Sequence, residues 1–155
     1  MTPRPDEVAD VARTIQAAVA PVFLLAGIGA FMNVMAGRLA RVVDRGRVVE
    51  ERYHGAAAPD RAPYLDELRL LDRRIKLASN AILLSVASGL AVCMLVAMMF
   101  IGEMSGLEIG TVVSLLFVLA LGLLAAALTM FLVETRIAVT SLRIDEELLK
   151  ADRLS

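Results

Sequence analysis

The sequence is poor in the residues on which most enzymes and disulfide-bonded domains depend. Its 155 residues include one cysteine, one histidine and no tryptophan. With Cys93 as the single thiol, no disulfide can form within the chain and no cysteine-rich metal site is available. His54 has no second imidazole nearby with which to bind a metal or form an acid–base pair. We therefore expect no enzyme activity, no bound metal and no other cofactor.

Signals for binding nucleotides or nucleic acids are also weak. The glycines of "GIG", residues 27–29, have neither a strand before them nor the third glycine of a dinucleotide-binding loop. Ten basic residues lie between Arg38 and Lys76, but seven acidic residues offset them in the same segment. We therefore expect no nucleic-acid partner.

What the sequence has in abundance is long hydrophobic runs. Hydrophobic residues make up 58% of the chain, and the mean hydropathy is +0.70. Three stretches without a charged side chain are each long enough to cross the roughly 30 Å hydrocarbon core of a bilayer as a helix; they are residues 15–37, 77–102 and 110–133. The first is too long for the apolar part of a secretory signal. The sequence therefore predicts an all-α integral membrane protein with three transmembrane helices in a lipid bilayer.

The charges are segregated along the chain and predict an orientation. Ten of the 16 Lys and Arg residues lie between Arg38 and Lys76, and four more follow Glu134. The turn between the second and third stretches carries acidic charge only. Because positive charge is retained on the cytoplasmic side, we expect a multi-pass protein of an inner membrane with its N-terminus outside and its C-terminus in the cytoplasm.

Helical periodicity continues beyond the hydrophobic stretches. Apolar residues recur at helical spacing in three flanking segments, which we expect to form long extensions that pack as a small cytoplasmic bundle; they are residues 38–53, 64–76 and 134–152. In the second segment the predicted contact face is Leu68, Leu71 and Ile75, and Ala78 continues it. Pro59 and Pro63 predict a break at residues 54–63. We treat residues 1–155 as a single membrane domain. Pro21 allows two alternatives, a single bent helix or a separate interfacial helix over residues 6–20.

The first hydrophobic stretch carries a stripe of small and polar residues. At about 100° per residue, these positions fall on one face of a helix; they are Ala26, Ala30, Asn33, Gly37, Ala40, Asp44 and Glu51. Such a face lets another helix approach closely, within the protomer or between copies, and Asn33 can donate a hydrogen bond across the contact. The alternative is that the stripe lines a polar path at the axis of a homo-oligomer.

A second candidate site is an ion pair at the inner membrane boundary. Glu134 ends the third hydrophobic stretch, at the same expected depth as Arg38, Arg41 and Lys76. An interfacial ion pair would offset the free-energy cost of a charged carboxylate near hydrocarbon. A transport role would instead require Glu134 to face a substrate path.

Several segments resemble a bacterial membrane-protein family, domain of unknown function 2721. The resemblance rests on "ARTIQAAVAPVFLLAGIGA" (12–30), "RLARVVDR" (38–45), "LDRRIKLASNAI" (71–82) and "VCMLVAMMF" (92–100). It implies a small helical protein of a bacterial inner membrane, and it implies no activity.

Two functions are consistent with these observations. The first is a homo-oligomeric ion channel or conduit with the first helix near its axis. The alternative is a non-catalytic scaffold or partner subunit, which uses the cytoplasmic bundle to hold a cytoplasmic or membrane protein. In both cases we expect self-association, because three spans bury little surface on their own.

Overall fold

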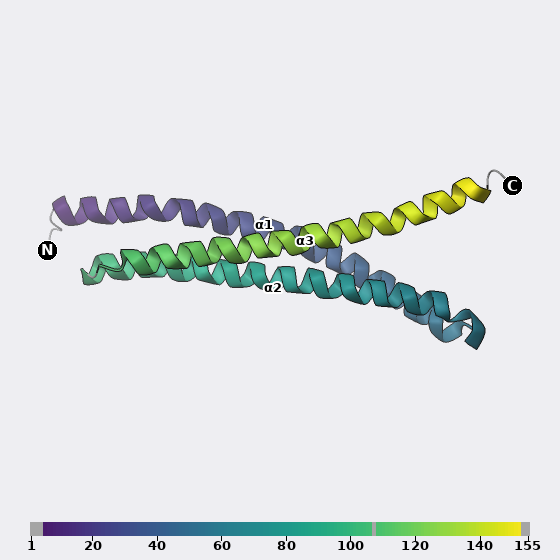
Figure 1. Cartoon of the computed structure of the whole chain (residues 1–155). Coiled ribbons are helices and arrows are strands. Elements are labelled where there is room, and N and C mark those ends of the chain that lie inside the picture. Colours follow the sequence, from purple (N-terminus) through teal and green to yellow (C-terminus); the bar gives the residue numbers. More distant parts are fainter. Residues whose placement is uncertain (1–4, 107, 153–155) are drawn as a thin grey trace. The chain divides into compact units, whose positions relative to one another are not determined.

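Every regular element in the described part of the chain is a helix, as predicted (Figure 1). The computed structural model describes the backbone of residues 5–106 and 108–152, and the side chains of residues 12–106 and 108–138. The elements are α1 (Pro5–Gly55), the short 3-10 helix η1 (Ala58–Asp60), α2 (Ala62–Ser105) and α3 (Gly110–Asp152).

The three long helices meet the length and composition requirements of membrane spans. The segments Ala12–Gly55, Ala58–Ser105 and Gly110–Ala138 each contain a strongly apolar window with few charges. Large apolar side chains on them lie on the outside, such as Phe23 at 73% exposure and Leu115 at 65%. In water such surfaces would cause aggregation, whereas lipid tails cover them at no cost. These features identify a multi-pass membrane protein.

All three helices are much longer than a span requires. About 20 residues cross a bilayer, yet α1 has 51 residues, α2 has 44 and α3 has 43. The predicted helical extensions are therefore present as helix, and side chains after residue 138 lie outside the described part. The two alternatives at Pro21 are resolved as well, since α1 passes through Pro21 without a break. Pro21 withholds one N–H from the carbonyl of Ala17 and leaves the rest of the helix intact.

Residues typical of helix ends explain where the connections between the long helices lie. The α1–α2 connection falls in the predicted break at residues 54–63, and Pro63 lies in the first turn of α2, where its missing N–H has no helical partner to lose. Arg61 stabilises this connection, because its Nε donates to the carbonyl of Ala56 at 3.0 Å and its guanidinium lies 5.3 Å from the ring centre of Tyr53. Gly106 follows the end of α2 with φ +65°, the left-handed conformation that commonly terminates a helix.

The chain divides into two compact units, and each long helix contributes to both. Unit 1 holds the described residues up to Asn33 together with Leu83–Ala126, and unit 2 holds Val34–Ile82 together with the described residues from Ala127 onward.

The interior of unit 1 is built mostly from small side chains. One cluster joins α1, α2 and α3 through Ile28, Ala91, Val92 and Ala120. Ser88 is fully buried, and its Oγ donates to the carbonyl oxygen of Ala120 at 2.8 Å. Small residues allow two helix backbones to approach closely, which is how helices commonly pack within a bilayer.

The interior of unit 2 uses larger aliphatic side chains between α1 and α2. Val42, Val49 and Leu71 form its buried cluster, and Leu68 and Ile75 pack against it at partial exposure. Leu68, Leu71 and Ile75 belong to the helical periodicity from which the extension of α2 was predicted, so that apolar face is confirmed as a contact surface.

The buried positions of α1 recur every seven residues. The series is Thr14, Pro21, Ile28, Met35, Val42 and Val49, and Ala18 is buried beside it. The corresponding series on α2 alternates steps of three and four residues, through Ala78, Ala81, Ser85, Ser88, Val92 and Leu95. This is the periodicity of helices that pack with side chains fitted between those of the neighbour.

Candidate functional site

The stripe on α1 lies on the outside of the protomer. In unit 1, Ala26, Ala30 and Asn33 are all exposed. In unit 2, the remaining stripe positions Gly37, Ala40, Asp44 and Glu51 are exposed as well. Packing against the protomer's own α2 and α3 therefore does not account for the stripe, because α1 makes those contacts with its heptad of buried residues.

Asn33 is the most polar group of the stripe within the apolar window of α1. Its side chain makes no hydrogen bond to the described residues. An amide in hydrocarbon without a hydrogen-bond partner costs several kcal/mol, about 2–7 depending on the reference state. Once α1 lies in a bilayer, this amide therefore needs water or a group from another molecule.

Among the described residues of unit 2, Glu134 is the most deeply buried charged one, with 2% of its side chain exposed. Its Oε1 accepts from Nη2 of Arg74 at 2.9 Å and from Nε of the same residue at 3.2 Å. Arg38 approaches from α1, with its Nε 3.9 Å from Oε2 of Glu134 and its Nη1 donating to Thr135 Oγ1 at 2.8 Å. The guanidinium groups of Arg38 and Arg74 therefore both stabilise the one buried carboxylate of Glu134.

Of the three basic residues expected near Glu134, the structure places Arg38 beside it. Lys76 instead pairs with Asp72 one turn earlier on α2, at 2.7 Å and largely exposed. The Nε of Arg41 donates to the carbonyl of Gly37 on its own helix at 3.2 Å. Both side chains therefore make their hydrogen bonds within their own helix.

Arg74 was not predicted as a partner of Glu134, although its position in the sequence indicated that role. It lies three residues after Leu71 and four before Ala78, and both of those were predicted to face the neighbouring helices. Residues at these spacings share a helix face. A basic residue on an otherwise apolar face indicates a buried carboxylate on a neighbouring helix.

Beside this ion pair lies a cavity of about 320 Å³. Arg38, Arg41, Arg45 and Arg74 line it, together with aliphatic side chains. Arg45 is held from α2 by Glu67, whose Oε1 lies 2.7 Å from its Nη2. We call this the arginine cavity.

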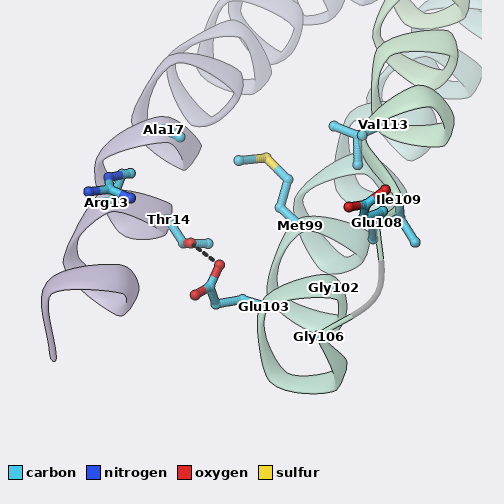
Figure 2. Close-up of a pocket in the computed structure, with 11 residues that line it drawn as sticks. Arg13, Thr14, Ala17, Met99, Gly102, Glu103, Gly106, Glu108, Ile109 and Val113 are labelled. Carbon is cyan, nitrogen blue, oxygen red and sulfur yellow. Dashed lines mark hydrogen bonds between the residues drawn. The ribbon is translucent and has the colours of Figure 1, made fainter. Parts of the chain in front are cut away.

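A second cavity, of about 660 Å³, lies in unit 1 where the end of α2 meets α1 and the start of α3 (Figure 2). Thr14 Oγ1 donates to Glu103 Oε2 at 3.1 Å across it. In Figure 2, Met99 lies between α1 and α2, and Glu108 lies on the side away from α1, beside α3. The Ala17 carbonyl that Pro21 leaves without a donor belongs to a lining residue. This open cavity thus offers oxygen acceptors on a surface made of polar and apolar side chains.

Neither cavity has the donor set of a resident metal. Among the described residues, no group of three or more His, Cys, Asp or Glu side chains could hold one. Cys93 is exposed on α2, and His54 stacks edge-on against Tyr53 at 5.5 Å between ring centres.

Comparison with known proteins gives a family and no activity. The sequence profile of a family described as "protein of unknown function (DUF2721)" matches residues 18–144. No curated protein and no solved structure matches the chain. The matched residues include both units, the arginine cavity and the whole α1 stripe, and leave out only the ends of the chain. The resemblance found in the sequence is thereby confirmed, and the chain belongs to the DUF2721 family.

Proposed function

We propose that the protein is a homo-oligomeric membrane conduit for ions, in which copies meet through the α1 stripe. The exposure of Asn33, with no hydrogen bond to the described residues, carries this proposal. A second copy or a water-filled axis would each satisfy the amide, whereas lipid tails would not.

Two further features support contact through this face. The small residues Ala26 and Ala30 allow a second helix to come close on either side of Asn33. A groove of about 500 Å³ with an almost wholly apolar lining runs beside them, and Ala26, Val22 and Phe23 are among its residues. By helical periodicity, Asp44 and Glu51 continue the same face of α1, so symmetry-related copies would form rings of carboxylates that favour cations.

Assembly is tested first, with the full chain in lipid discs. Ala30→Leu enlarges a stripe residue, and we expect it to weaken association by about 1–3 kcal/mol, a factor of about 5 to 150. Ala20→Leu is the matched control, because Ala20 is also exposed on α1 and lies about 120° away from the centre of the stripe. Mass photometry of the discs gives the number of copies. A wild-type chain that is monomeric at all protein-to-lipid ratios would overturn the proposal.

Conduction is tested separately in liposomes. We expect wild-type protein to carry a cation flux and Asn33→Leu to abolish most of it while the assembly persists, because leucine removes the polar group from the axis. An assembled wild-type protein without any flux would instead favour the scaffold function, with the helical extensions of unit 2 as its binding surface.

A further inference from the structure

The arginine cavity gathers more positive charge than its neighbours neutralise. Four guanidinium groups, from Arg38, Arg41, Arg45 and Arg74, line it. Two carboxylates pair with them, Glu134 with Arg74 and Arg38, and Glu67 with Arg45. Among the described residues, four positive and two negative charges leave a net charge of +2. Arg41 and Arg45 are exposed, so water solvates part of this excess, and a bound anion would neutralise it.

The four arginines keep donors available after these contacts. Arg74 uses Nε and Nη2, and Arg45 uses the same two atoms, so each retains its Nη1. Arg38 directs Nη1 at Thr135 and Nε toward Glu134, which leaves Nη2. Arg41 commits only Nε, to a backbone carbonyl, and keeps both terminal nitrogens. Planar forks of N–H donors are matched to the oxygens of a phosphate group.

Arg41 and Arg45 are exposed, whereas the surroundings of Arg74 and Arg38 strengthen the hydrogen bonds that these two can donate. Arg74 and Arg38 have side-chain exposures of only 17% and 29%, so solvent competes weakly for their N–H groups. The aliphatic side chains of Val42 and Leu71 complete the lining. A cavity of about 320 Å³ is large enough for a phosphate group and part of what it esterifies.

We propose that the arginine cavity is a binding site for a phosphate group, with Arg41 as its principal free donor. Arg38 directly follows the first predicted span, so the site lies where the headgroups of phospholipids are expected, and basic pockets between helices at that depth commonly bind such headgroups. A dissolved phosphate offers the same chemistry. The inference does not depend on self-association or conduction.

The test uses the full chain, stripped of lipid in a mild non-ionic detergent, and isothermal titration calorimetry with three probes. Inorganic phosphate represents the dissolved source, and a short-chain phosphatidic acid represents the lipid source. A short-chain diacylglycerol has the same tails without the phosphate. Arg41→Gln removes the free fork without breaking an ion pair, and Arg47→Gln is the matched control, an exposed arginine of α1 outside the cavity.

We expect at least one phosphate-bearing probe to bind, Arg41→Gln to weaken that binding about tenfold or more, and Arg47→Gln to leave it unchanged. Binding of phosphatidic acid alone assigns the site to lipid headgroups, and equal binding of inorganic phosphate assigns it to a dissolved anion. The proposal is overturned if neither phosphate probe binds, if diacylglycerol binds as well as phosphatidic acid, or if both variants weaken binding equally.

Discussion

The two compact units use the same three helices but hold them together by different chemistry. In unit 1 the helices meet through small residues such as Ala91, Ala120 and Ser88, and through hydroxyl hydrogen bonds. In unit 2, α1 and α2 meet through Val42, Val49 and Leu71, and ion pairs link the helices. These two kinds of contact are typical of helices that pack in lipid and of helices that pack in water, respectively.

Between helices in lipid there is no hydrophobic driving force, so close backbone contact and interhelical hydrogen bonds take its place. Where water surrounds a helix pair, the burial of large aliphatic side chains stabilises it directly, by about 25 cal/mol per Å² of apolar surface. Unit 1 therefore has the chemistry of a membrane interior. The α1–α2 contact of unit 2 has that of a water-exposed helical hairpin, as expected of extensions beyond the bilayer.

The largest predicted effect concerns the charged contact of unit 2. Arg74→Ala removes both hydrogen bonds to Oε1 of Glu134 and leaves a buried carboxylate with only the more distant Arg38. We expect a loss of about 3–5 kcal/mol in the free energy of unfolding, measured by denaturant titration in detergent. Arg73→Ala, at the exposed neighbouring position, should change it by about 0.5 kcal/mol or less.

Removing both charges of the Arg74–Glu134 pair is a second test of this ion pair. Because the pair itself contributes little net stability against well-packed apolar groups, the double variant Arg74→Met/Glu134→Leu should recover most of the stability that Arg74→Ala loses. If Arg74→Ala is as mild as Arg73→Ala, the ion pair does not hold the helices of unit 2.

A smaller effect is expected from the small-residue contact of unit 1. Ala120 is fully buried against α2, and leucine at this position would force the two backbones apart. We expect Ala120→Leu to cost about 1–3 kcal/mol, read from the same titration. Ala126→Leu is the control, because Ala126 is an exposed position on α3. Equal tolerance of both changes would contradict close packing in unit 1.

The smallest effect concerns the exposed pair of Lys76 and Asp72. Both side chains are largely exposed, so solvent screens their attraction even though they lie 2.7 Å apart. Lys76→Ala should lower the free energy of unfolding by no more than about 0.5 kcal/mol. A loss comparable to that of Arg74→Ala would show that unit 2 depends on surface charge as well as on its buried pair.

Much of the fold could be predicted because hydrophobic length and helical periodicity are local signals. The three helices, the break after α1 and the apolar face of α2 through Leu71 all follow from spacing alone. Within the first hydrophobic stretch the inward face of α1 was not predicted, although Ile28 and Met35 are seven residues apart and Val42 continues the series in the predicted extension. The small residues of the stripe drew attention to the opposite face, and in lipid an apolar residue can face either way without cost.

The candidate site was harder to predict because it depends on pairing between helices. The sequence identified Glu134 as a carboxylate that needs a cation, but it offered three basic residues at a similar depth, with Arg74 two residues before Lys76. Which of them reaches Glu134 depends on the rotation of α2 about its axis. The apolar face of α2 contains that information, since Arg74 lies on it and Lys76 does not.

The Arg74–Glu134 pair has a consequence for how the helices are aligned lengthwise. Buried alanines such as Ala120 and Ala127 recur at seven-residue spacing on α3, so a slide of one heptad would replace one small contact with another at little cost. The same slide would set Ala127 opposite Arg74 and leave both buried charges without partners. The pair thus fixes the register of α3 against α2 in unit 2, much as one polar residue fixes the alignment of a coiled coil.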